Sequence, residues 1–141
     1  AKDDLIEAER VLELVGMSHL RDEVANSLPL GMRRMLEVAR AVIAQPRVLL
    51  LDEIASGMDE NGLERLSALI ESLRDAGATV LLVEHNFRLV LSLADTIVVL
   101  AQGRVIASGP PEEIENHPKV LSEYLGVEHD AATIAKLEEA N

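Results

Sequence analysis

The 141-residue sequence contains no cysteine and no tryptophan, and its other aromatic residues are Phe87 and Tyr124 alone. Without cysteine, the chain can form neither disulfides nor cysteine-ligated metal sites. It also has no apolar stretch near the roughly 20 residues that a membrane-spanning helix requires. Positive charge is scarce, because 13 Lys and Arg against 25 Asp and Glu give a formal charge of −12. This balance argues against a nucleic-acid binder, which needs a basic face to meet phosphates.

The rest of the composition suits one folded domain. Hydrophobic residues make up 48% of the chain, so Leu, Val, Ile and Ala must build its core. Apolar residues recur at helical spacing in three stretches, each followed by a Gly or Pro of the kind that ends helices. The predicted helices are 5–15, 31–44 and 63–73, followed by Gly16, Pro46 and Gly77.

Short continuous apolar runs lie between and after these helices, at 48–51, 79–83 and 96–100. Because they lack polar alternation, we expect strands covered on both faces, as in a parallel sheet with helices on either side. The chain after these runs is expected to form a turn at 102–103, a strand at 104–107, a helix from Pro110 and a short exposed helix within 127–141. The sequence therefore predicts an α/β fold.

The most informative stretch is 48–53, where four apolar residues end in Asp52 and Glu53. Open α/β sheets bind ligands at the carboxyl ends of their strands. One carboxylate suits a hydrated Mg²⁺, which prefers oxygen ligands, and its neighbour can orient or deprotonate a water. Taken alone, the pattern fits a strand that runs into an acidic loop equally well.

Three other stretches carry weaker signals. His85 also follows an apolar strand, so we expect it at the same sheet edge, where it can donate a hydrogen bond to a phosphate; the alternative is a loop or helix-capping histidine. Residues 27–31 lead into a helix whose first N–H groups suit a phosphate, or they form an ordinary helix start. Residues 56–59 can equally be a turn that caps the next helix.

The order and spacing of these stretches resemble the ATPase subunit of ABC transporters from about Val11 to Gly126. The matching stretches are 28–32 for the LSGGQ signature, 48–53 for Walker B, 56–59 for the D-loop and His85 for the switch histidine. Two later segments, 101–114 and 117–126, are similar to the C-terminal part of subunits that serve branched-chain amino acid importers.

This resemblance implies that two such subunits sandwich ATP head to tail. Asp52 would hold Mg²⁺ through water, Glu53 would act as general base on the attacking water, and His85 would contact the γ-phosphate. The signature would meet the phosphates across the dimer, and the D-loop would couple the two sites. The signature and D-loop residues expected at the ATP site are Leu28, Pro29, Leu30, Gly31, Met32, Ser56 and Asp59.

The resemblance also implies the setting of the chain. We expect a second ATPase subunit and transmembrane permease subunits as partners, no nucleic acid, and a place in the cytoplasm on the inner face of the cell membrane. The expected fold is the C-terminal part of an ABC-type P-loop NTPase, with a mostly parallel sheet flanked by helices. Its expected parts are 1–46 with the signature and part of the helical subdomain, 47–109 in the catalytic core, and a helical tail at 110–141.

The sequence departs from the family pattern in two ways. No G-x-x-x-x-G-K-[ST] occurs, so we expect the loop that cradles the β- and γ-phosphates in a preceding half that is missing here. Within the signature, Pro29, Leu30 and Met32 replace a Ser, a Gly and a Gln, and Ile54 stands where a Pro is common. We therefore expect the chain alone to hydrolyse no ATP, and its uncovered strands to expose apolar rows that favour self-association.

Two other classes stay open. A non-catalytic interaction module that keeps an ABC-like scaffold fits the missing phosphate loop and the altered signature. An ATPase head of the SMC or DNA-repair type has the same motif order, but the charge of −12 and the importer-like C-terminal segments disfavour it.

Overall fold

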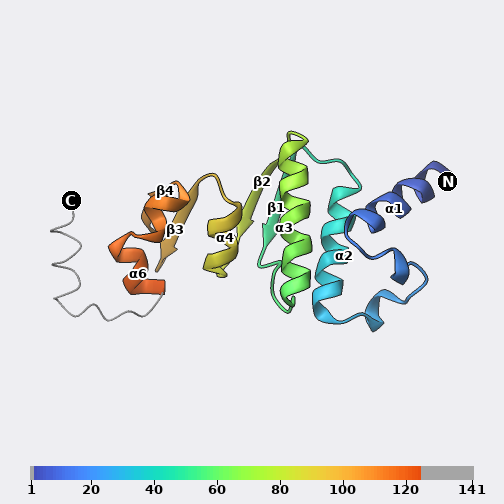
Figure 1. The fold of residues 1–141 in the computed structure, drawn as a ribbon, viewed down its shortest axis with the longest axis horizontal. Coiled ribbons are helices and arrows are strands. Elements are labelled where there is room, and N and C mark those ends of the chain that lie inside the picture. Colours follow the sequence, from blue (N-terminus) through green and yellow to red (C-terminus); the bar gives the residue numbers. More distant parts are fainter. Residues whose placement is uncertain (1, 125–141) are drawn as a thin grey trace. The chain divides into compact units, whose positions relative to one another are not determined.

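The structure is a computed structural model that describes residues 2–124, and it divides into two compact units after Leu93 (Figure 1). Each unit has buried apolar residues of its own. The helix expected within 127–141 lies outside the described residues. None of the helices in the described part combines the length and the apolar character needed to cross a membrane.

The first unit alternates helices and strands, which confirms the predicted α/β pattern. Its elements are α1 (Lys2–Leu14), α2 (Leu30–Val42), β1 (Val48–Asp52), α3 (Glu60–Asp75), β2 (Thr79–Val83) and α4 (Phe87–Leu93), with 3-10 turns at Ser18–Leu20 and Ala25–Ser27. Gly16 and Gly77 follow α1 and α3 with φ of +70° and +92°, the left-handed conformation that favours glycine at a helix end. The predicted helix ends therefore hold to within a few residues.

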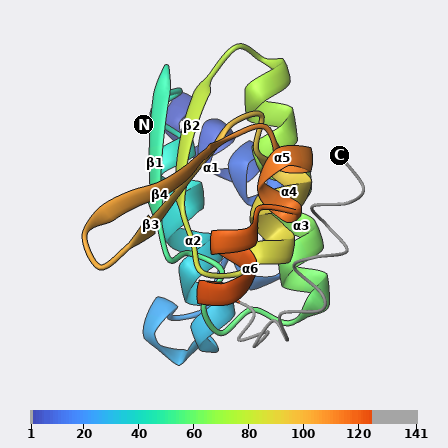
Figure 2. The same ribbon diagram turned by 90° about the vertical axis from the view of Figure 1, so that its left-hand side faces the viewer.

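Strands β1 and β2 pair in parallel, with Leu50 opposite Leu81. Leu49 and Leu51 point to the inner face of β1, where they are buried in one core with residues of α2 and α3. Figure 2 shows both helices on the same side of the two strands. On the other face, Leu50 and Leu81 stay 69% and 58% exposed. Among the described residues the strands are thus covered on one face, not on both, and the expected apolar rows are exposed.

The second unit contains a hairpin followed by two short helices. Its elements are β3 (Ile97–Ala101), β4 (Arg104–Gly109), α5 (Pro111–Glu115) and α6 (Pro118–Tyr124). Gln102 and Gly103 join the strands with φ of +49° and +76°, the backbone of a two-residue hairpin turn, as predicted. Helix α5 has a Pro in its first turn, also as predicted.

The run 96–100 forms a strand, as predicted, and it belongs to the hairpin that the turn at 102–103 predicts. Strand β3 pairs antiparallel with β4. Its residues alternate between the two faces: Ile97 and Val99 are buried, whereas Val98 and Leu100 are more than half exposed. The strand is therefore covered on one face among the described residues, not on both, because an all-apolar run gives no sign of which face is covered.

Candidate functional site

The carboxyl ends of β1 and β2 lie side by side, and they carry the acidic and histidine residues. Asp52 and Val83 are the last paired residues of the two strands, and the N–H of Glu53 donates to the carbonyl of Val83 at 2.8 Å. Neighbouring strands lie roughly 4.8 Å apart, so Glu53 and Glu84 leave the sheet next to each other. His85 follows directly. The structure thus brings Glu53 and His85 to one edge of the sheet, with both side chains exposed.

Glu53 has a backbone conformation that few residues other than glycine adopt. Its φ is +47°, in the left-handed region, where a β-carbon crowds the following carbonyl at a cost of about 1–2 kcal/mol. Asp52 still belongs to β1 and continues the exposed row of Val48 and Leu50. The change of conformation at Glu53 ends the strand and lets two consecutive carboxylates project differently.

The loop after Glu53 is held by a side chain from the neighbouring strand end. The N–H of Ala55 donates to Oε1 of Glu84 at 2.7 Å, in a partly buried contact. Ile54 and Ala55 are themselves buried. The other oxygen of Glu84, Oε2, is shielded from solvent and has no hydrogen-bond partner among the described residues. Glu84 was not among the residues predicted from the sequence, because its contact depends on the strand register that brings positions 55 and 84 together.

The segment that resembles the signature leads into α2 and packs against the loop 56–59. Leu28 is buried, and Pro29 precedes α2 without a side-chain hydrogen bond to the helix. A β-carbon built on Gly31 would lie 2.7 Å from the carbonyl oxygen of Gly57, so the two backbones touch. The first N–H groups of α2 have no partner within the helix. These two predicted segments therefore form one continuous surface in the same chain.

Two helix caps involve residues in or next to the segments for which the sequence left alternatives open. Oδ1 of Asp59 accepts from the N–H of Gly62 at 2.8 Å, so the turn 56–59 does cap α3. At α4, Oδ1 of Asn86 accepts from the N–H of Leu89 at 3.1 Å. Asn86 thus makes the capping bond that was one alternative for His85, and His85 lies in the turn before it.

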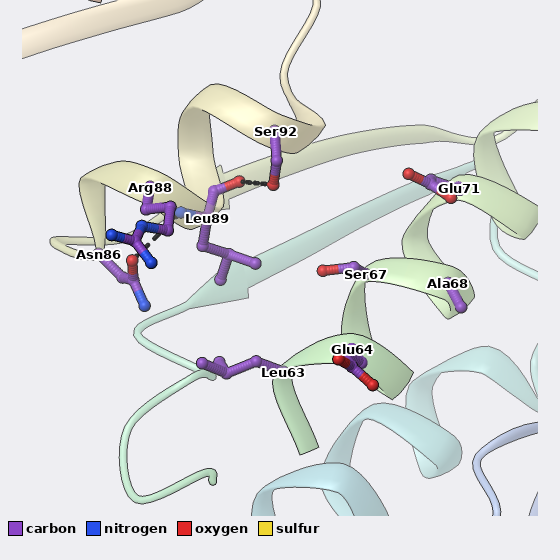
Figure 3. Close-up of a pocket in the computed structure, with 9 residues that line it drawn as sticks. All are labelled: Leu63, Glu64, Ser67, Ala68, Glu71, Asn86, Arg88, Leu89 and Ser92. Atoms are coloured by element: carbon purple, nitrogen blue, oxygen red, sulfur yellow. Dashed lines mark hydrogen bonds between the residues drawn. The ribbon is translucent and has the colours of Figure 1, made fainter. Parts of the chain in front are cut away.

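An open groove of about 330 Å³ lies beside this turn, between α3 and α4 (Figure 3). Leu63 and Ser67 line it from α3, and Leu89 and Ser92 line it from α4. In Figure 3 the Ser92 hydroxyl donates to the carbonyl of Leu89, at 2.8 Å. None of the predicted site residues lines the groove, so it is separate from the candidate site.

The donor set at the strand ends limits which metal fits. Among residues 2–124, no three His, Asp or Glu gather into a group that could hold a metal ion. Asp52 offers a single exposed carboxylate. That fits Mg²⁺, which keeps several waters and is commonly bound by one or two carboxylates together with substrate phosphates.

Comparison with known proteins gives matches at both ends of the chain. Residues 2–56 match the family described as ABC transporter, and residues 104–130 match the one described as branched-chain amino acid ATP-binding cassette transporter. The chain is 43% identical to the high-affinity branched-chain amino acid transport ATP-binding protein BraF of Pseudomonas aeruginosa over 116 residues. The aligned region covers 82% of this chain and 46% of BraF.

Two further proteins are similar. The lipopolysaccharide export system ATP-binding protein LptB of Escherichia coli is 40% identical over 119 residues, 84% of this chain and 49% of its own length. A solved structure, the ADP conformation of MJ1267, an ATP-binding cassette of an ABC transporter, has a TM-score of 0.77 at 28% identity, over 89% of this chain and 51% of that one. The chain spans about half the length of the curated relatives it matches. The structural likeness confirms the predicted fold class.

Proposed function

Because this chain belongs to the ATP-binding proteins of ABC transporters, we propose that it is the part of an ATPase subunit that supplies the catalytic carboxylate and the switch histidine. The observation that carries the proposal is the register of β1 and β2, which sets Glu53 and His85 at one exposed strand edge. The reaction is the transfer of the γ-phosphoryl group of ATP to water. In such reactions, positioning and charge stabilisation supply most of the rate.

Each residue has a role in this proposal. Asp52 holds Mg²⁺ through water, and the ion neutralises charge on the phosphates when it is bound. Glu53 accepts the proton of the attacking water. His85 donates a hydrogen bond to a γ-phosphate oxygen. Residues 28–32, at the start of α2, meet the phosphates of a nucleotide bound by the partner subunit, where helix N–H groups favour an anion. Ser56 and Asp59 couple the two sites of the dimer.

The proposal divides the chain by role into 1–46 with the signature, 47–109 with the catalytic edge, and 110–141 as a tail. The parent subunit pairs with a second ATPase subunit and with transmembrane permease subunits, and works at the cytoplasmic face of the membrane. The match at 104–130 favours an importer of branched-chain amino acids. Overall identity does not choose the solute, since BraF and LptB are almost equally similar and their names give different cargoes.

The test uses the whole ATPase subunit, which carries this chain together with a phosphate-binding loop. Replacing Glu53 by Gln keeps the shape and removes the base, so turnover should fall about 10²–10⁴-fold while ATP still binds. Glu71→Gln, on the exposed side of α3, is the matched control and should change neither quantity. Unchanged turnover in Glu53→Gln contradicts the proposed role.

A non-catalytic module is the second candidate, because Pro29 offers the signature neither a hydroxyl nor an N–H. The purified 141-residue chain should hydrolyse no ATP under either proposal, and steady turnover by it would contradict both. The whole subunit separates them: ATP-dependent dimerisation and hydrolysis support the enzyme, whereas their absence in a folded subunit supports the module.

A further inference from the structure

Glu84 carries a carboxylate that the proposed chemistry does not use. Oε1 accepts from the N–H of Ala55 at 2.7 Å, and Oε2 is buried without a partner among the described residues. A carboxylate held away from water needs a structural or chemical reason, because its desolvation is unfavourable. The reason must lie in what Oε1 holds, namely the loop that begins at Glu53.

Two hydrogen bonds enclose the left-handed backbone of Glu53. On one side, its own N–H donates to the carbonyl of Val83 at 2.8 Å. On the other side, the N–H of Ala55 donates to Glu84. Ile54, between them, is 6% exposed and fixed in the core. Both acceptors belong to consecutive residues at the end of β2, so β2 holds the chain before and after Glu53.

This arrangement helps to hold the unfavourable positive φ of Glu53. A positive φ is unfavourable for a residue with a β-carbon and persists only where the surroundings hold it. The contacts at Ile54 and Ala55 restrict the backbone after Glu53. Without the Glu84 contact, the N–H of Ala55 loses its acceptor. The burial of Ile54 and the N–H of Ser56, which donates to the carbonyl of Glu53 at 3.4 Å, are then left to hold the turn, so we expect Glu53 to adopt ordinary φ values more often. The direction of the Glu53 carboxylate changes with that backbone.

We propose that Glu84 is a positioning residue for Glu53: its carboxylate binds the N–H of Ala55 and thereby keeps Glu53 in the left-handed conformation that aims its side chain at the reacting water. The inference about catalysis rests on the proposed function. The inference about conformation does not, so the two can be tested apart.

The first test measures conformation by NMR in the 141-residue chain. In Glu84→Leu, which has a similar size and no acceptor, amide exchange at Ala55 should rise about tenfold or more, as expected for a lost hydrogen bond. The Cα and Cβ shifts of Glu53 should leave their left-handed values. Glu84→Gln keeps an acceptor oxygen and should preserve both signals. Glu71→Leu, which removes an exposed carboxylate from α3, is the matched control and should leave both unchanged.

The second test measures ATP turnover in the whole subunit. Glu84→Leu should lower kcat with little change in KM, because the proposal gives Glu84 no contact with the nucleotide, and Glu84→Gln should restore kcat. Glu53→Gln is measured alongside. If Glu53→Gln retains full turnover, the proposed function fails, and the NMR test still decides the conformational inference. If Glu53→Gln is inactive but Glu84→Leu has normal kcat, the positioning role fails alone.

The inference is overturned if Ala55 exchange and the Glu53 shifts are the same in wild type and Glu84→Leu. It is also overturned if Glu84→Gln behaves like Glu84→Leu. Should Glu84→Leu not fold, Glu84→Ala takes its place. The wild-type chain gives a separate check, since an Ala55 amide that exchanges as fast as an open loop contradicts the contact.

Discussion

Gly31 and Gly57 meet backbone to backbone, so closely that a β-carbon on Gly31 would lie 2.7 Å from the carbonyl oxygen of Gly57. The contact joins the first turn of α2 to the loop that follows Glu53. A β-carbon on Gly57 would in turn lie 2.8 Å from Cδ2 of Leu30. The two segments predicted to face nucleotide are therefore packed closely against each other within one chain.

The first prediction concerns Gly31→Ala. In an exposed helix this change usually stabilises, by about 0.5–1 kcal/mol. Here we expect the opposite sign, a loss of about 1–3 kcal/mol, because the added carbon meets backbone that cannot rotate away. The measurement is the free energy of unfolding in urea. Met32→Ala, at the next and more exposed position of α2, is the control, and a Gly31→Ala variant as stable as wild type refutes the close contact.

The second prediction separates the two roles of Asp59. Its carboxylate caps α3 through the N–H of Gly62 at 2.8 Å, so Asp59→Ala should cost about 1 kcal/mol. Asn caps as well as Asp, so Asp59→Asn should melt like wild type. If Asp59 also couples the two ATP sites, as proposed, Asp59→Asn should still lower turnover of the whole subunit. Equal loss of thermal stability in both variants would contradict the capping role.

Much of the first unit could be predicted because its signals are local. Helix α3 ends at Asp75, just before Gly77, whose positive φ stops the helix, and the strand 48–52 is marked by apolar residues that lead into two acids. The run 96–100 was predicted as a strand followed by a two-residue turn and a second strand, and this hairpin is found. That one face of β3 is exposed could not be predicted, because its residues are all apolar.

In the candidate site, too, local signals could be predicted, whereas contacts that depend on register and packing could not. Glu53 and His85 were predicted at one edge because parallel strands end together, and that requires only knowing where each strand stops. The contact of Glu84 with Ala55 depends instead on exact register and on the left-handed turn at Glu53, which the residue type does not announce. The Gly31–Gly57 approach likewise depends on how the first turn of α2 packs against a loop 26 positions further along the chain, and no local pattern encodes it.

The third prediction concerns pH and α1. The pKa of Glu7 is lowered from 4.5, first by its hydrogen bond with Arg10, whose Nη2 lies 2.7 Å from Oε1. A lowered pKa means that the contact contributes stability above the ordinary value and loses it as pH falls through the lower, folded pKa. The ¹³C titration midpoint of the Glu7 carboxyl should therefore lie below 4.5.

The variant Arg10→Gln should return this midpoint toward 4.5, and high salt should move it the same way because the pair is exposed. Arg33→Gln, an exposed Arg of α2, removes the same charge elsewhere and should leave the Glu7 midpoint where it was. A midpoint that is insensitive to Arg10→Gln would show that the pair does not persist in solution.

The fourth prediction concerns the exposed face of β1 and β2. Leu50 and Leu81 stand opposite each other on it and are 69% and 58% exposed, beside Val48 and Val83. A row of this kind on a two-stranded sheet favours association, because burying each leucine is worth about 1.5–3 kcal/mol. The 141-residue chain should therefore self-associate as its concentration rises in sedimentation velocity.

The double variant Leu50→Lys with Leu81→Glu places opposite charges across the strands, which keeps the pairing favourable while removing the apolar row. We expect it to weaken association at least about tenfold, whereas Glu71→Lys on α3 should not. A wild-type chain that stays monomeric with a sharp melting transition would contradict this prediction.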